Sequence, residues 1–111
     1  MSQQEKQQQT GGRTREKSRP KTPRHYQVVF HNDDTTTMDF VVMLLVTVFG
    51  KPQDQALFLM LKVHHEGQAI VGVYTYDIAR SKTEKATQMA RDAGFPLRIT
   101  YQPASNDLLP F

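Results

Sequence analysis

Residues 30–40 read FHNDDTTTMDF and join two apolar patterns of different period. Before this stretch, Tyr26, Val28 and Phe30 alternate with other residues, which is typical of a strand with one buried face. From Met38 onward, apolar residues recur at intervals of three and four, which predicts a helix. Asn, Asp and Thr favour turns and helix N-termini because their side chains bond nearby backbone groups. The stretch therefore predicts a strand-to-helix turn.

Capping and breaking residues delimit the first two predicted helices. Thr36, followed three residues later by Asp39, resembles a capping box with Asp in place of the usual Glu. Gly50 is expected to close the first helix, and Pro52 to lie in the first turn of the second, where its missing N–H does no harm. Gly67 is placed to be a left-handed cap of that second helix.

The rest of the chain predicts a strand over residues 69–76, a helix over 77–93 and a strand over 97–102. In the second of the three predicted helices, the residues at helical spacing are Ala56, Leu57, Met60, Leu61 and His64. Gly72 interrupts the second predicted strand, which indicates a bulge or a close contact. The order is β-α-α-β-α-β, an α/β (α+β) domain with three helices on a small three-stranded sheet.

The basic charge of the chain lies near its N-terminus. Residues 1–25 contain seven Lys and Arg against two Glu, whereas the remainder contains seven basic and nine acidic residues. Up to Pro23 the chain has almost no apolar residue, so this segment cannot bury enough surface to offset the entropy of ordering. We predict a disordered arm over residues 1–23 and one folded domain over residues 24–111, a length that suits a single core.

Several features indicate a soluble intracellular protein. The sequence contains no cysteine, and no apolar run approaches the ~20 residues needed to span a bilayer. The first ten residues, MSQQEKQQQT, lack the apolar segment of a secretory signal. A reducing compartment and no membrane contact are the resulting expectations.

The sequence contains none of the common catalytic motifs: no Gly-rich phosphate loop, no G-x-S-x-G and no H-E-x-x-H. His64 and His65 are adjacent and would point about 100° apart on a helix, which does not suit a zinc site. Asn32, Asp33 and Asp34 lack the alternation and the closing Glu of a calcium loop. We predict no enzyme, no cofactor and no metal; a small hydrolase that uses Asp33 or Asp34 with His64 is an alternative.

His64 has two interpretations. The second predicted helix places it with Met60 and Leu61 on a face that also carries core residues. A single histidine in such a position is often a core polar group with a satisfied hydrogen bond. The other interpretation is a binding residue, and spacing alone does not decide between the two.

Four segments carry motifs that occur here in one order: YQVVFHNDDTTTMDFV (residues 26–41), ALFLMLKVHHEG (56–67), GVYTYDIA (72–79) and FPL (95–97). The combination N-D-D-x-T-x-M-D-F followed by M-L-x-V-H-x-x-G is specific. Over residues 24–102 the chain closely resembles the ClpS family of adaptor proteins. The resemblance implies three helices packed against an antiparallel sheet.

The resemblance also implies a function. Members of the family bind the N-terminal residue of N-degron substrates when it is bulky and hydrophobic (Phe, Leu, Tyr or Trp), and deliver the substrate to a ClpA- or ClpC-type AAA+ unfoldase for degradation. Matched position by position, the α-amino group would be bound by Asn32, Asp34 and His64. The hydrophobic pocket would be lined by Thr36, Met38, Val41, Met60, Val63 and Leu97. Met38 takes the place of the family's gating methionine, which excludes β-branched residues.

Docking on the N-terminal domain of the unfoldase would involve Asp77 and Lys82, and the basic arm matches the family's mobile N-terminal arm in kind. This chain departs from the family pattern with Thr37, where many members have proline, and with Asp39 and Asp77, where Glu is commoner. The expected location is the bacterial cytoplasm, with a plastid stroma as the alternative. The alternative partner is nucleic acid, bound through the basic arm with a steep salt dependence.

Overall fold

The computed structural model describes residues 25–104, and its elements follow the predicted order. The elements are β1 (His25–His31), α1 (Met38–Thr47), α2 (Gln53–Glu66), β2 (Gln68–Thr75), α3 (Tyr76–Asp92) and β3 (Arg98–Pro103). The predicted arm over residues 1–23 lies outside the described residues, as does the end of the predicted domain. None of the helices within residues 25–104 is long and apolar enough to cross a membrane.

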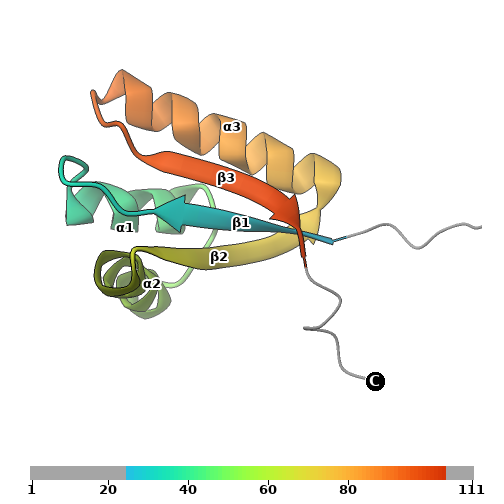
Figure 1. Ribbon diagram of the computed structural model, residues 1–111, viewed down its shortest axis with the longest axis horizontal. Coiled ribbons are helices and arrows are strands. Elements are labelled where there is room, and N and C mark those ends of the chain that lie inside the picture. Colours follow the sequence, from blue (N-terminus) through green and yellow to red (C-terminus); the bar gives the residue numbers. More distant parts are fainter. Residues whose placement is uncertain (1–24, 105–111) are drawn as a thin grey trace, which may run out of the picture.

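The three strands form an antiparallel sheet with β1 in its centre, between β2 and β3 (Figure 1). Val28 pairs with Gly72, but Val29 pairs with the residue two positions before Gly72, so Val71 is an extra residue in β2. A Cβ atom on Gly72 would collide with the side chain of Tyr74. Gly72 was predicted to mark a bulge or a close contact, and the structure has both, the bulge at the neighbouring Val71.

One core lies between the sheet and the helices. Val28 and Phe30 of β1 are fully buried, as are Leu44 and Leu45 of α1. α3 contributes small side chains to the core, among them Ala86, so that it packs closely against the sheet. Figure 1 shows α3 running alongside β3 and α1 behind β1. This packing places the start of α1 beside α2, where the site described below lies.

The apolar residues of α2 extend beyond the side of the helix that is buried. Ala56, Met60 and Val63 are buried in the core. Leu57 and Leu61, which share the predicted helical spacing, are 42% and 44% exposed. An α-helix with apolar residues on more than one side buries only the side that meets its neighbours. The remaining apolar side of α2 faces solvent.

Candidate functional site

A cavity of about 420 Å³ lies between the β1–α1 turn, the start of α1 and one side of α2. It is lined by Asn32, Asp33, Asp34, Thr35, Thr36, Thr37, Met38, Val41, Met60, Val63 and His64. We call this the site cavity. It brings together all three residues predicted for the α-amino group and five of the six predicted for the hydrophobic pocket.

Asp33 holds the β1–α1 turn in shape. Its Oδ1 accepts hydrogen bonds from the backbone N–H groups of Thr35, at 2.8 Å, and Thr36, at 2.7 Å. The Thr36 hydroxyl donates to Asp33 Oδ2 at 2.8 Å. Partial burial acts to raise the pKa of Asp33, but these bonds, together with the charge of Arg91, outweigh it and lower that pKa below its usual value of 3.8. The Asp33 carboxylate is therefore a structural acceptor, which argues against its use as a catalytic base.

The N-cap of α1 is Thr37, so the predicted capping box of Thr36 with Asp39 is wrong. The Thr37 hydroxyl accepts the backbone N–H of Phe40 at 3.2 Å. Thr36 does not cap the helix because its hydroxyl donates to Asp33 instead. Thr37 has φ −74° and ψ 152°, a conformation that proline also adopts. Thr37 thus has a backbone conformation that proline could keep, and its hydroxyl adds a cap that proline could not supply.

Gly67 brings the end of α2 next to the β1–α1 turn. It has φ +89°, in the left-handed region that favours glycine, and its N–H bonds the Val63 carbonyl as predicted for a cap. The Gly67 carbonyl then accepts the backbone N–H of Asn32 at 2.9 Å. This bond joins the last turn of α2, which carries His64, to the residue where the turn begins. Asn32 and His64 thus line the same cavity although they are distant in sequence.

Three polar side chains of the site cavity are available to bind a ligand. Asn32, Asp34 and His64 are all exposed. Within residues 25–104 none of them forms a hydrogen bond with another side chain. The interpretation of His64 as a buried core histidine is wrong, because its side chain faces solvent and lines the cavity. An amide oxygen, a carboxylate and a neutral imidazole are hydrogen-bond acceptors, which suits a cation with N–H groups.

The other wall of the cavity is apolar and graded in depth. Val41, Met60 and Val63 are 6%, 8% and 3% exposed, so they form its inner part. Met38 is 44% exposed and lies at the rim. Leu97, the sixth predicted pocket residue, is buried in the core at 1% exposure and is not among the lining residues. Its contact with a bound side chain stays a prediction.

The two residues predicted to contact an unfoldase lie on α3, outside the site cavity. Asp77 is exposed in the first turn of α3. Lys82 is partly buried, and its Nζ donates to the Val48 carbonyl at 2.8 Å. The same Nζ lies 5.5 Å from the centre of the Tyr74 ring and 6.0 Å from that of Phe49. Lys82 therefore joins α3 to the end of α1, a role that no local sequence signal indicates.

Within residues 25–104 the histidine and carboxylate side chains do not assemble into a metal site. In the part of the chain that the structure describes, no three His, Cys, Asp or Glu side chains lie close enough together to hold a metal ion. His64 has the ring of His65 as its aromatic neighbour, with the ring centres 5.2 Å apart and the planes at 69°. The arrangement of the site cavity suits binding of a cationic group next to an apolar one.

Comparison with known proteins identifies relatives of this chain. Residues 21–100 match the family model described as ATP-dependent Clp protease adaptor protein ClpS. The ClpS adapter protein of Syntrophus aciditrophicus is 55% identical over 78 residues, which are 70% of this chain and 73% of that protein. The ClpS adapter protein of Acetivibrio thermocellus is 52% identical over 83 residues, or 75% of this chain and 84% of that protein.

A solved structure supports the same assignment. The structure of Agrobacterium tumefaciens ClpS2 bound to L-phenylalaninamide superposes with a TM-score of 0.73 at 38% identity. The match covers 75% of this chain and 100% of that chain. The family model alone spans well over half of the sequence. The chain therefore belongs to the ClpS family of ATP-dependent Clp protease adaptor proteins.

Proposed function

We propose that this protein binds the free N-terminus of proteins whose first residue is Phe, Leu, Tyr or Trp, and delivers them to a Clp protease. The observation that carries the proposal is one cavity with three acceptor side chains on one side and a buried apolar wall on the other. The ligand of the Agrobacterium tumefaciens relative, L-phenylalaninamide, combines an α-amino group with a benzyl side chain. These are the two chemical features that the cavity would accommodate.

The α-ammonium group would be bound by Asn32, Asp34 and His64. It is a compact cation with three N–H donors, and these side chains supply an amide oxygen, a carboxylate and a ring nitrogen as acceptors. Charge-assisted hydrogen bonds are stronger than neutral ones, so Asp34 is the main anchor. Acetylation of the N-terminus removes the charge and two donors, and binding should be lost.

The first side chain of the substrate would enter between Met38 and the buried wall of Val41, Met60 and Val63. Full burial of a Leu or Phe side chain contributes about 1.5–3 kcal/mol. Methionine side chains adapt to both aliphatic and aromatic guests because they are flexible and polarizable. Met38 at the rim would exclude side chains that branch at Cβ.

Delivery requires a second surface. We assign the contact with the N-terminal domain of a ClpA- or ClpC-type unfoldase to the side of α3 that carries Asp77 and Lys82. Asp77 is exposed, and the Lys82 ammonium has two further donors besides the one that bonds Val48. The protein itself would act without catalysis, in the cytoplasm, and the arm over residues 1–23 would take part in transfer of the substrate.

Fluorescence anisotropy with short peptides tests the proposal. Peptides that begin with Phe, Leu or Val are compared with a free and with an acetylated N-terminus. We expect binding of the free Phe and Leu peptides, and much weaker binding of the Val peptide and of every acetylated peptide. Equal binding of free and acetylated Phe peptides would contradict the proposal. Nucleic acid binding that falls steeply with salt, without any peptide binding, would favour the alternative partner.

A further inference from the structure

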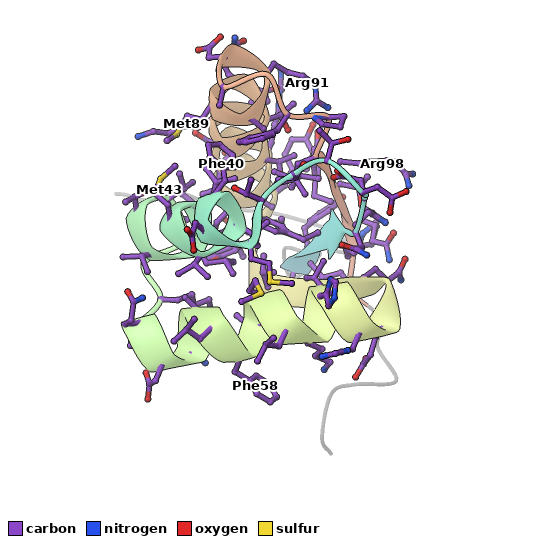
Figure 2. The ribbon with its side chains drawn as sticks, turned by 90° about the vertical axis from the view of Figure 1, so that its left-hand side faces the viewer. Phe40, Met43, Phe58, Met89, Arg91 and Arg98 are labelled. Carbon is purple, nitrogen blue, oxygen red and sulfur yellow. The ribbon has the colours of Figure 1, made fainter. Side chains whose placement is uncertain are left out.

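The side of α2 that faces away from the core is apolar. Leu57, Phe58 and Leu61 are 42%, 65% and 44% exposed, and we call these three residues the α2 strip. Figure 2 shows Phe58 projecting from α2 on the side opposite α1. Large apolar side chains clustered on a surface often mark a binding site, whereas scattered ones need no explanation. The cluster on α2 is therefore a candidate binding surface.

The α2 strip lies beside the site cavity, on the same helix. Leu57, Leu61 and His64 are spaced by four and by three residues, so they lie on one side of the helix. His64 lines the site cavity. Leu61 and Phe58 line a second cavity of about 370 Å³, together with Lys62, His65 and Glu66. His64 lines the first cavity and His65 the second, and their rings are 5.2 Å apart, so the two cavities lie next to each other on α2.

We propose that the α2 strip binds the residues that follow the N-terminal residue of a substrate, and that apolar side chains at about its third to fifth positions strengthen binding. This inference rests on the proposed function. From His64 to Phe58 the helix advances about 9 Å, at 1.5 Å per residue. An extended peptide covers that distance in about three residues, at roughly 3.3 Å each. A first residue in the site cavity thus places the next few along the strip.

The side chains around the two cavities favour a peptide that runs along α2 over one that leaves across the β1–α1 turn. On the side of the β1–α1 turn the lining of the site cavity includes Asp33, Asp34 and Thr35, which offer an emerging peptide little apolar contact. The second cavity contains one lysine and one glutamate, so it does not select a strongly charged segment. A second copy of this chain is a poorer occupant, because three partly exposed side chains supply far less than the ~800 Å² per partner of a stable interface.

The test compares two labelled peptides that both begin with Phe and differ at positions three to five, which are Leu in one and Ser in the other. With the full-length protein we expect the Leu peptide to bind about three- to tenfold more tightly, since partial burial of two or three apolar side chains contributes that much. In the double variant Leu57→Ser/Leu61→Ser, the two peptides should bind equally, with the affinity that the wild type shows for the Ser peptide. Phe58→Gln should reduce the preference.

Ile70→Ser is the matched control, because Ile70 is 41% exposed on β2 and outside both cavities. This variant should keep the full preference. Equal binding of the two peptides by the wild type, or an unchanged preference in the double variant, would overturn the inference. Sedimentation without peptide adds a second check: a dimer that Leu61→Ser dissociates would make the strip a contact between copies and would also overturn it.

The acetylated forms of both peptides separate this inference from the proposed function. If acetylation weakens neither peptide, the proposed function fails and the inference fails with it. If acetylation abolishes binding of both while the free peptides bind equally, only the inference fails. If acetylation abolishes binding and the free Leu peptide binds more tightly, both stand.

Discussion

The two ends of α1 differ in how the fold uses the ionisable side chains beside them. At the N-terminal end, Asp34 and His64 line the site cavity and have no side-chain hydrogen-bond partner in the described residues 25–104. At the C-terminal end, Lys82 donates to the Val48 carbonyl and lies near two aromatic rings. Within the described residues, the first pair can bind a ligand without breaking a side-chain hydrogen bond. A residue that matches a family motif is therefore a better candidate for ligand binding at the N-terminal end of α1 than at the C-terminal end.

Removal of the Asp34 carboxylate should have the largest effect, a loss of peptide binding. Asp34→Ala is expected to weaken binding of a free Phe peptide roughly 10- to 100-fold, because a hydrogen bond to a charged group contributes about 1.5–3 kcal/mol. The melting temperature should stay within a degree or two of wild type, since Asp34 bonds no other side chain within residues 25–104. Anisotropy and calorimetry measure the two quantities.

Asp39→Ala is the matched control, because Asp39 is also exposed near the start of α1 but does not line the site cavity. It should leave peptide binding unchanged. If Asp34→Ala lowered the melting temperature and left binding intact, the carboxylate would belong to the fold, and the contrast between the two ends of α1 would disappear.

The order of the elements could be predicted from the sequence, because apolar period and Gly or Pro positions are local signals. The ends of the predicted elements agree with the structure to within a few residues. The resemblance predicted Asp34 for the site, but the role of Asp33 in holding the turn could not be predicted. Both are the same residue type in the same turn, and only the backbone path decides that Asp33 accepts from Thr35 and Thr36.

Contacts between segments that are distant in sequence could not be predicted either. Lys82 and Val48 are 34 residues apart, and neither residue type indicates that the two form a hydrogen bond. The exposure of Leu57 and Leu61 depends on how α2 is rotated against the sheet, which helical spacing does not specify. The resemblance identified eight of the eleven residues that line the site cavity. The hydrogen bonds that leave Asn32, Asp34 and His64 without a side-chain partner within residues 25–104 became visible only in the structure.

At the other end of α1, Lys82→Met should change stability and not peptide binding. The substitution keeps an unbranched stem but removes the donor to Val48 and the cation beside Tyr74. A loss of about 1–2 kcal/mol in the free energy of unfolding is expected. Urea denaturation measures it. Lys85→Met, an exposed lysine on the same helix, is the control and should have little effect. An unchanged stability in Lys82→Met would mean that the bond to Val48 contributes nothing.

A smaller effect is expected at the N-cap of α1, which supports the rim of the site cavity. Thr37→Ala removes the acceptor for the Phe40 N–H and should cost about 1 kcal/mol. Thr37→Pro loses the same acceptor but restricts the unfolded chain at a φ that proline accepts, and should recover about 0.4–1 kcal/mol of that loss. Thermal unfolding of the two variants gives the order. If Thr37→Pro were less stable than Thr37→Ala, the inference that proline fits the backbone conformation of Thr37 would be wrong.

The smallest effect is the acid dependence that Asp33 contributes. Burial acts to raise the pKa of this carboxyl, but the N–H groups of Thr36 and Thr35, the Thr36 hydroxyl and the charge of Arg91 lower it below 3.8. The ionised form is thus favoured by folding, so its contribution is fully present above pH 3.8 and is lost as the pH falls through the lower folded value. Asp33→Asn should therefore lower stability at neutral pH and flatten the fall in stability below pH 4. A variant whose stability declines in acid as steeply as wild type would show that other carboxyls dominate that range. The contrast between adjacent aspartates would then rest on peptide binding alone.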